Sequence, residues 1–334
     1  MLLSIIIVNY KSAQLISNCI YSLIQYSGGL QHEVIIVDND SKDNSEQVLT
    51  TQFPFIKWIQ MGYNAGFARA NNAGIRISKG DIILLLNPDT LFKDDSLEIC
   101  LNKFNSSSYV ACGVQLLNED GTPQISGNYA MKGGLNYLLP LPYTGALLKG
   151  IAGLLSVKKP NVPNASGTIE VDWINGAFLM TKKVIIDQAG LLDEDFFLYA
   201  EEAEWCSRLK RFGPLCIFGQ CHVYHLQGEV SNDTFNSAGK GYFNLYDRKG
   251  LQIMLSNLVR IRKEFSIGWF LFILLVYTVT IPVFLAIGLI HNILTLRNLS
   301  QFFRKWLGFT ENVLYVWKLC STILSNRPYF YKVL

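Results

Sequence analysis

One strand-like stretch constrains this chain more than any other. The sequence "DIILLLNPD" places five aliphatic residues in a row at 82–86, directly followed by Asn87, Pro88 and Asp89. A short apolar run bounded by turn residues indicates a strand that is buried on both faces. Pro88 has no N–H, so it ends the hydrogen-bond ladder and fixes the turn. Asp89 is therefore expected at the carboxyl end of a buried strand, although Asn-Pro-Asp also suits an ordinary type I turn.

The first 120 residues repeat this pattern. Further apolar strands are expected at 2–10, 33–40 and 56–60, with helices at 13–25 and 68–77 between them. Strands that alternate with helices predict a parallel sheet whose faces are covered. In such sheets, ligands bind beyond the carboxyl ends of the strands. Polar residues follow those ends at Asn9, Tyr10, Asp38, Asn39, Asp40, Asn87 and Asp89.

The apolar residues are concentrated in one later segment. Half of the 334 residues are hydrophobic, and residues 267–290 contain no charged side chain. About 20 helical residues cross a bilayer core of about 30 Å. Because Pro282 lies inside the run, a kinked span and a re-entrant hairpin that bends there are both open, and a buried core helix is the alternative. Basic residues flank the run on both sides with a small excess before it, which favours cytosolic flanks and a re-entrant or interfacial arrangement.

Charge and cysteine content exclude other classes. The net charge of +3 is too small to indicate nucleic-acid binding, and no dense Lys/Arg run is present. Seven cysteines at irregular spacing predict reduced thiols in a protein that faces the cytosol. The start "MLLSIIIVNYKS" predicts no signal peptide, because it reaches polar residues within a few positions.

Several motifs occur together in a recognisable order. They are "SIIIVNYKS", "VDNDSKDNS" (37–45), "YNAGFARANNAGI" (63–75), "LLLNPDT", the long stretch 171–213 containing "WINGAF" and "YAEEAEW", and "VYHLQGEVS" (223–231). In this order and spacing the chain resembles family 2 glycosyltransferases of the GT-A fold, in particular their rhamnosyltransferase-like branch. The resemblance implies a Rossmann-like α/β catalytic domain and a nucleoside diphosphate sugar as donor.

The resemblance also implies a metal site. The family's Asp-x-Asp position reads Asn87-Pro88-Asp89 here, so Asp89 is the carboxylate ligand expected for Mg²⁺ or Mn²⁺. Asn87 offers a neutral oxygen to the metal or a contact to the nucleotide. His225 matches the family's late histidine and is the candidate second ligand, which favours Mn²⁺ somewhat. A purely structural role of His225 is the alternative, and His222 has no such support.

The general base is expected in an acidic pair that opens a helix. Inverting transfer needs a carboxylate that takes the proton of the acceptor hydroxyl. In "YAEEAEW", Glu202 occupies the family's base position, Glu201 stands beside it, and Glu204 follows. Glu replaces the usual Asp, which leaves open whether Glu201 or Glu202 is the base. Acidic residues in a first helical turn also simply complement the helix dipole.

The resemblance also implies which residues bind the nucleotide and the sugars. Asp38 matches the contact to the pyrimidine ring, and Asn9, Tyr10 and Asp40 are expected to line that pocket. The donor- and acceptor-binding candidates are Gly66, Trp173, Asn175 and Gly176. Gly66 permits close backbone approach, and Trp173 is a candidate for stacking on a sugar. Helix capping by Asp40 and plain packing of Tyr10 and Trp173 remain alternatives.

Residues 129–167 have no counterpart in the family core. They are apolar and punctuated by Gly and Pro, so a loop that faces lipid or covers the acceptor and a packed insertion are both open.

We therefore expect a GT-A glycosyltransferase domain at 1–245 and a helical membrane-associating tail at 246–334. The expected enzyme works at the cytoplasmic face of the cell membrane. It transfers a hexosyl or deoxyhexosyl group, with inversion, to a growing surface polysaccharide of the cell envelope on a lipid-linked acceptor. A sugar nucleotidyltransferase would need a Gly-rich, basic loop after the first strand, which "VNYKSAQL" lacks. A non-catalytic sugar-nucleotide-binding membrane scaffold remains the alternative from another class.

Overall fold

The computed structural model describes residues 2–27, 29–129, 134–156, 161–226, 234–235, 237 and 244–334. Its contacts divide the chain into two compact units, which are described separately. The α/β unit comprises residues 1–131, 160–194 and 201–230. The helical unit comprises residues 132–159, 195–200 and 231–334, and so includes residues 132–159, 195–200 and 231–245 of the predicted catalytic domain.

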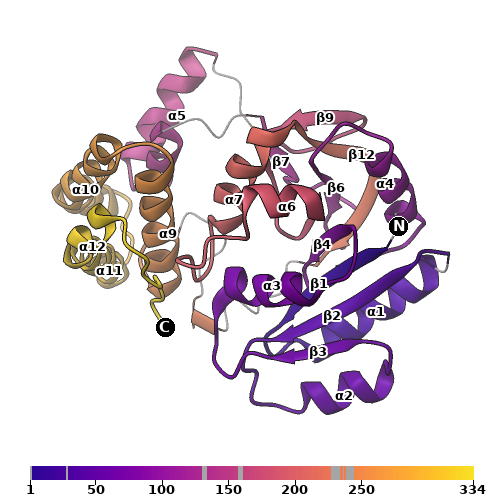
Figure 1. Ribbon diagram of the computed structural model, residues 1–334. Coiled ribbons are helices and arrows are strands. Elements are labelled where there is room, and N and C mark those ends of the chain that lie inside the picture. The colour runs from indigo at the N-terminus through magenta and orange to yellow at the C-terminus, as the bar shows by residue number, and fades with distance from the viewer. Residues whose placement is uncertain are drawn as a thin grey trace. The chain divides into compact units, whose positions relative to one another are not determined.

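The α/β unit is built on a mixed, mostly parallel sheet (Figure 1). Its parallel core consists of β3 (Lys57–Gln60), β2 (His32–Asp38), β1 (Leu3–Asn9) and β4 (Ile82–Leu86). The sheet continues through β11 (Phe178–Lys182), which is antiparallel to β4 and β6 (Ala111–Leu117), and through β12 (Leu215–His225), which is parallel to β6. The strands β5 (Thr90–Leu91) and β9 (Thr168–Val171) pair with β12. The predicted parallel core is confirmed.

Both faces of this sheet are buried because alternate side chains of each strand point to opposite sides. Ile5 and Ile7 of β1 belong to one core cluster, and Ile6 belongs to another. The first cluster packs under α1 (Ala13–Tyr26), α2 (Ser45–Gln52) and α4 (Ser96–Asn105). The second packs under α3 (Gly66–Ile77), α6 (Lys183–Ala189) and α7 (Glu201–Leu209). A short 3-10 helix follows α7 at Lys210–Phe212. The strands β7 (Gly127–Asn128), β8 (Asn161–Val162) and β10 (Trp173–Ile174) form a small separate sheet.

The register of the central strands brings the predicted polar residues to one edge. Asn9 at the end of β1 lies opposite Asp38 at the end of β2. On the other side of β1, Ile7 pairs with Leu86, the last residue of β4. Asn87 and Asp89 therefore follow directly at the edge where β1 and β2 also end.

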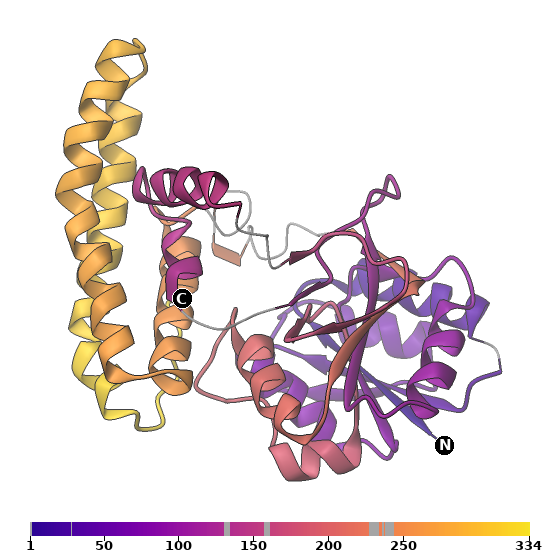
Figure 2. The same ribbon diagram turned by 90° about the horizontal axis from the view of Figure 1, so that it is seen from above.

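The helical unit contains α9 (Arg248–Glu264), α10 (Ile267–Leu294), α11 (Leu299–Lys318) and α12 (Cys320–Ser325). Figure 2 shows α10 and α11 as two long helices side by side, which agrees with their contacts. By length and composition α10 is able to cross a membrane, with a mean hydropathy of 2.6, and a third of its most apolar window is buried. Helix α10 is thus a weak candidate for membrane association, because it also packs against other helices of its own unit.

Of the two arrangements left open for Pro282, a hairpin that turns at this residue is not formed. Helix α10 continues through Pro282, and the chain reverses only between Leu294 and Leu299. Packing along α11 holds α10 just before the proline: the Trp317 indole N–H donates to Thr278 Oγ1 (2.9 Å), and that of Trp306 donates to the Ile281 carbonyl (3.0 Å). A proline weakens a helix locally, but neighbouring contacts keep it continuous.

The unmatched stretch 129–167 contributes the 3-10 helix η1 (Gly134–Leu138) and α5 (Thr144–Leu154) to the helical unit, apart from residues 130–133 and 157–160, which lie outside the described residues. Helix α5 exposes large apolar side chains along one face at Leu147, Ile151 and Leu154. This exposure argues against a fully packed insertion.

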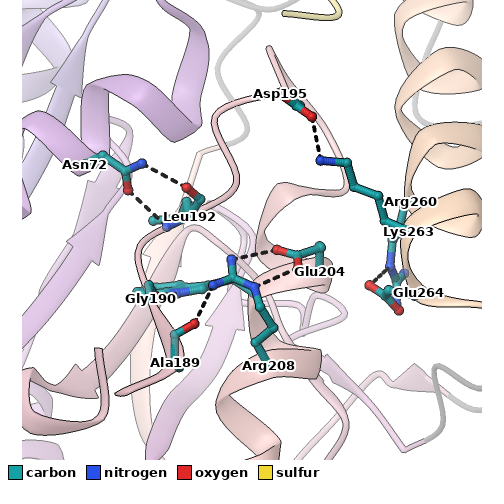
Figure 3. A network of polar contacts seen from close by, with 11 residues as sticks. Asn72, Ala189, Gly190, Leu192, Asp195, Glu204, Arg208, Arg260, Lys263 and Glu264 are labelled. Carbon is teal, nitrogen blue, oxygen red and sulfur yellow. Dashed lines mark hydrogen bonds and ion pairs between the residues drawn. The ribbon is translucent and has the colours of Figure 1, made fainter. Parts of the chain in front are cut away.

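The segment 195–200 is held by α9 and by the last residues of the chain. Asp195 accepts hydrogen bonds from Lys263 Nζ (2.6 Å, Figure 3) and from the backbone N–H of Tyr329 (2.9 Å). The Asp195 carbonyl accepts from the Tyr331 N–H (2.9 Å), and Gln252 Nε2 donates to the Tyr331 carbonyl (2.9 Å). The buried polar residues of α9 thereby fix two distant segments of the chain.

All seven cysteines are buried free thiols, as expected of reduced cysteines. Burial raises the pKa of Cys19 to about 12, although a hydrogen bond with Thr90 opposes this shift. The thiolate is the reactive form, so such a thiol is chemically quiet at neutral pH.

Candidate active site

The carboxylate of Asp38, at the end of β2, accepts hydrogen bonds from protein donors at both of its oxygens. Asp38 is 3% exposed. Its Oδ1 accepts from Asn9 Nδ2 (2.6 Å) and Ser41 Oγ (2.5 Å), and its Oδ2 accepts from the Ser41 N–H (3.0 Å) and Gln60 Nε2 (2.9 Å). A carboxylate has about four acceptor positions. Asp38 is therefore saturated, and it holds the ends of β1, β2 and β3 together.

A small open pocket lies beside this carboxylate. It is lined by Asp38, Asp40, Lys42, Asp43, Ser45, Glu46, Trp58 and Gln60. Asp40 has a φ of +64° and lies 3.3 Å from Lys42 Nζ. The alternative of a helix cap is not observed for Asp40, because α2 begins after Asn44. Tyr10, the residue that follows β1, is half-buried. Its ring centre lies 5.6 Å from Lys11 Nζ.

The turn that leads into α3 depends on Asn39 and Gly66. Asn39 Oδ1 accepts from the Ala65 N–H (2.7 Å), and its Nδ2 donates to the Gly66 carbonyl (3.1 Å). Gly66 has a φ of +73°, a conformation that other residues adopt at a cost. The glycine is thus required by the turn itself, whatever ligand approaches it.

The end of β4 brings the predicted metal ligands together. His225 Nε2 lies 3.4 Å from Asp89 Oδ1 and 3.3 Å from Asn87 Nδ2. The three residues meet because His225 on β12 pairs with Thr90 on β5, the residue after Asp89. Asp89 is 8% exposed, and the backbone N–H of Asn87 donates to the Ala177 carbonyl (3.0 Å). Residues 227–231, which follow the histidine in its motif, lie outside the described residues.

Gln124 determines which nitrogen of His225 faces Asp89. Gln124 Nε2 donates to the His225 carbonyl (2.6 Å) and to Asn118 Oδ1 (2.8 Å), so the amide oxygen is the atom that points to the ring. That oxygen lies 3.0 Å from His225 Nδ1, and it can only accept. Nδ1 therefore carries the proton, and in the neutral ring Nε2 presents its lone pair toward Asp89. Hydrogen-bond acceptors at the other ring nitrogen orient metal-binding histidines in this way.

This donor set fits a divalent cation that is shared with a substrate. A lone pair of nitrogen and a carboxylate oxygen lie side by side at a partly open edge, and Asn87 adds an amide. Within the described residues, no group of three His, Cys, Asp or Glu side chains forms a closed metal site. Mg²⁺ in particular is usually held by one or two carboxylates together with phosphate oxygens. Two protein ligands therefore suffice if the substrate supplies the others.

The acidic pair opens α7 as expected. Glu201 is buried, Glu202 is half-buried, and the two residues before them, Tyr199 and Ala200, have φ values of +71° and +69°. Left-handed backbone at two consecutive non-glycine residues is strained and is often found at functional sites. A Cβ on Gly176 would lie 3.6 Å from Glu202 Cγ, so Glu202 packs over the turn that follows β10.

Glu204 has a structural role. Its two oxygens accept from Arg208 Nε and one terminal nitrogen at 2.7 Å each, and another Arg208 nitrogen donates to the Ala189 carbonyl (2.7 Å, Figure 3). Figure 3 also shows Asn72 of α3 bonded to both the N–H and the carbonyl of Leu192. These contacts fix α7 and the loop before it.

The "WINGAF" residues lie on and after β10. Trp173 is half-buried against the core, and its indole nitrogen has no hydrogen-bond partner among the described residues. Asn175 Nδ2 donates to the Ile125 carbonyl (3.2 Å), and its Oδ1 accepts from the Ala177 N–H (2.9 Å). Asn175 therefore shapes the turn that carries Gly176 under Glu202.

Sequence reasoning missed Gln124, Ser41 and Gln60. Ser41 lies inside the quoted motif "VDNDSKDNS", so its position after Asp38 was a usable signal. Gln124 and Gln60 lie outside the quoted motifs, and only tertiary geometry reveals their contacts.

Comparison with known proteins gives consistent similarities. Residues 4–165 match the model of the family Glycosyl transferase family 2. The low-salt glycan biosynthesis hexosyltransferase Agl10 of Haloferax volcanii is 32% identical over 254 residues, which cover 74% of each chain. The N-acetylglucosaminyl-diphospho-decaprenol L-rhamnosyltransferase of Mycobacterium tuberculosis is 24% identical and covers 62% of this chain and 68% of its own.

A solved structure also shares the fold. The crystal structure of GalNAc-T7 with UDP, GalNAc and Mn²⁺ matches with a TM-score of 0.52 at 11% identity, covering 78% of this chain and 48% of the other. Identity at this level indicates a shared fold alone.

Proposed function

Since the chain belongs to glycosyl transferase family 2, we propose that it transfers a hexosyl or deoxyhexosyl group, rhamnosyl included, from a nucleoside diphosphate sugar to a growing glycan. Its α/β unit has a GT-A-like fold with a mostly parallel, mixed sheet. The observation that carries the proposal is the convergence of Asn87, Asp89 and His225 at the end of β4. A leaving diphosphate needs charge neutralisation at this edge.

Asp89 and His225 would hold the cation. A bound Mg²⁺ or Mn²⁺ would neutralise the charge of the nucleoside diphosphate that leaves when the bond between the anomeric carbon and the diphosphate oxygen breaks. Asp89 contributes the negative oxygen and His225 the Nε2 lone pair, which Gln124 keeps pointed toward Asp89. Asn87 Nδ2 lies 3.3 Å from the same Nε2, so this amide has to turn away when the cation takes the lone pair.

Glu202 is the proposed base. It takes the proton of the acceptor hydroxyl while that oxygen attacks the anomeric carbon on the face opposite the diphosphate, which inverts the configuration. Its position above Gly176 at the start of α7 and the strained backbone before it support this role. Glu201 is the second candidate, and Glu204 is excluded by its pairing with Arg208.

The pocket beside Asp38 is proposed to bind the nucleotide. Asn9 orients Asp38, and Tyr10 and Asp40 border the same strand ends. Because Asp38 is saturated, an N–H of a pyrimidine ring must replace one of its present donors. Gln60 is the exposed donor of the four and is the one that we expect to move. Gly66, Trp173, Asn175 and Gly176 are proposed to border the donor sugar and the acceptor.

The acceptor is proposed to be carried on a polyprenyl lipid in surface-polysaccharide synthesis. The mycobacterial relative is named for an acceptor on a decaprenyl diphosphate. We propose a catalytic domain at 1–245 and a membrane-associating tail at 246–334 at the cytoplasmic face of the cell membrane, where nucleotide sugars are made. The apolar helix α10 supports this placement.

A donor hydrolysis screen tests the reaction class. The full chain is incubated with UDP-, GDP- and dTDP-sugars in the presence of Mg²⁺ or Mn²⁺, and released nucleoside diphosphate is measured. We expect release from one donor class and its loss in excess chelator. No release from any donor, together with no donor binding by calorimetry, would reject the proposal in favour of a protein without this chemistry.

A further inference from the structure

Helix α10 has one exposed apolar face. The side chains of Phe272, Leu275, Val279, Ile290 and Ile293 recur at helical spacing, and all are exposed. The opposite face is buried in the helical unit through Ile273, Tyr277, Phe284 and Gly288. An exposed apolar strip of this length on a chain in water marks an interaction surface.

Helix α11 extends that face. Its exposed apolar residues Phe303, Leu307, Leu314 and Trp317 also recur at helical spacing. Trp317 borders the exposed strip of α10, because its indole donates to Thr278 Oγ1 (2.9 Å) next to Val279. Near the other end, a Cβ on Gly288 would lie 2.2 Å from the Phe302 ring, so the two helices pack closely there. The two strips thus form one surface, here called the hairpin face.

The charge beside the hairpin face is mainly basic, with Glu311 of α11 as an acidic exception. No Asp or Glu occurs between Glu264 and Glu311, whereas Arg297, Arg304 and Lys305 lie in that interval. All three basic residues are exposed. Anionic lipid headgroups attract basic residues beside an apolar helix face.

Packing of α11 along α10 opposes a simple span. Arg304, Glu311 and Lys318 recur every seven residues and occupy the face of α11 next to its apolar strip. If α10 crossed the bilayer with α11 packed beside it, these charges would enter the hydrocarbon. Charged side chains there are costly. In a surface arrangement they remain at the headgroup level while the apolar strips enter the acyl region.

We propose that α10 and α11 lie in the plane of an anionic bilayer leaflet, with the hairpin face embedded and neither helix crossing. This proposal rests on the membrane association proposed above and specifies its geometry. It does not depend on the proposed reaction. Helix α5 of the same unit also exposes an apolar face. It begins beside α10, where the Tyr143 and Phe284 ring centres lie 6.0 Å apart.

Vesicle flotation tests the surface. The full chain is exchanged from detergent into vesicles of phosphatidylcholine alone or with phosphatidylglycerol. We expect preferential binding to the anionic vesicles. The triple variant Leu275→Ser, Val279→Ser and Leu307→Ser should lose at least about tenfold in binding. The double variant Arg297→Gln and Arg304→Gln should lose roughly tenfold on anionic vesicles and little on neutral ones.

A matched control separates the hairpin face from apolarity in general. The triple variant Ile24→Ser, Ile77→Ser and Val184→Ser removes equally exposed apolar side chains from helices of the α/β unit and should bind as the parent chain does. Equal loss in both triple variants would overturn the proposal. So would a chain that ignores vesicles but forms dimers that the hairpin triple variant abolishes, because the face would then bind a second copy.

Thiol labelling decides between the surface and a span. All native cysteines are buried, so Gly268→Cys and Gln301→Cys place single accessible thiols at the two ends of α10. In sealed vesicles with the protein bound from outside, an impermeant maleimide should label both. Labelling of one position only until the vesicles are opened would establish a span and overturn the in-plane arrangement. Donor hydrolysis by the vesicle-bound chain is measured in parallel, so failure of the surface and failure of the reaction are distinguishable.

Discussion

The ends of β2 and β4 each carry one buried carboxylate, and the two sites are built in opposite ways. Asp38 accepts four hydrogen bonds from protein donors at 2.5–3.0 Å. Asp89 instead faces the Nε2 atom of His225 at 3.4 Å, an atom whose lone pair adds to the negative character of the site. A carboxylate surrounded by donors stabilises the fold, whereas one beside another electron-pair donor suits a cation. We therefore propose that Asp89 holds the cation, whereas Asp38 holds three strand ends together and meets the nucleotide only when one of its present donors moves away.

The largest contrast is expected from Asp89→Ala. Loss of the anionic ligand should lower transfer about 10⁴-fold, because metal-assisted neutralisation of the leaving group contributes several kcal/mol. The thermal midpoint should fall less than in a variant of Asp38, because Asp38 accepts four hydrogen bonds that hold three strand ends together. Transfer rates and melting curves measure both. Full turnover by the variant, or by the parent chain in excess chelator, would remove Asp89 from the metal site.

The next largest effect is expected at the proposed base, Glu202, which lies at the start of α7 and not at the end of β2 or β4. Glu202→Gln should keep donor affinity and lose about 10³-fold in turnover, because general base catalysis acts only in the transition state. Glu201→Gln is the matched control one residue away. A dead Glu201→Gln beside an active Glu202→Gln would transfer the role to Glu201, and activity in both variants would place the base elsewhere.

Asp38→Asn sharpens the structural side of the comparison. The amide nitrogen of Asn would face donors such as Ser41 and Gln60, so at least one buried donor loses its acceptor. We expect a loss of about 1–3 kcal/mol in the free energy of unfolding, measured by denaturant titration. If stability is unchanged and only donor affinity falls, Asp38 acts on the ligand and the proposed contrast with Asp89 fails.

Gln124→Leu should have the smallest effect of the four on turnover. The substitution removes the acceptor of His225 Nδ1 and frees the ring to change tautomer, which should weaken Mn²⁺ binding about 10–100-fold. Calorimetry measures the affinity, and nitrogen NMR of the imidazole measures the tautomer without metal. Gln124→Glu keeps an acceptor at that position and should restore the tautomer. An unchanged tautomer in Gln124→Leu would show that Gln124 does not position the histidine.

The central strands could be predicted from the sequence alone, whereas several contacts of the candidate site could not. The strands β1, β2 and β4 were predictable because their apolar runs are buried on both faces, and their register then brings Asn9 to Asp38. His225 reaches Asp89 through the pairing of β12 with β5, which no local pattern indicates. Gln124 was not predictable for the same reason. Sequence alone left open whether the chain turns at Pro282, because the contacts with α11 that accompany a continuous α10 come from residues distant in sequence.

The anchoring of segment 195–200 has a consequence for how the chain tolerates shortening. Tyr331 is buried, its N–H and carbonyl bond Asp195 and Gln252, and the Tyr329 N–H bonds the Asp195 carboxylate. Deleting residues 329–334 would strip these partners from the loop that continues directly into Glu201 and Glu202. Damage at the far carboxyl end should thus appear first as impaired proton abstraction, long before the helices of that unit melt.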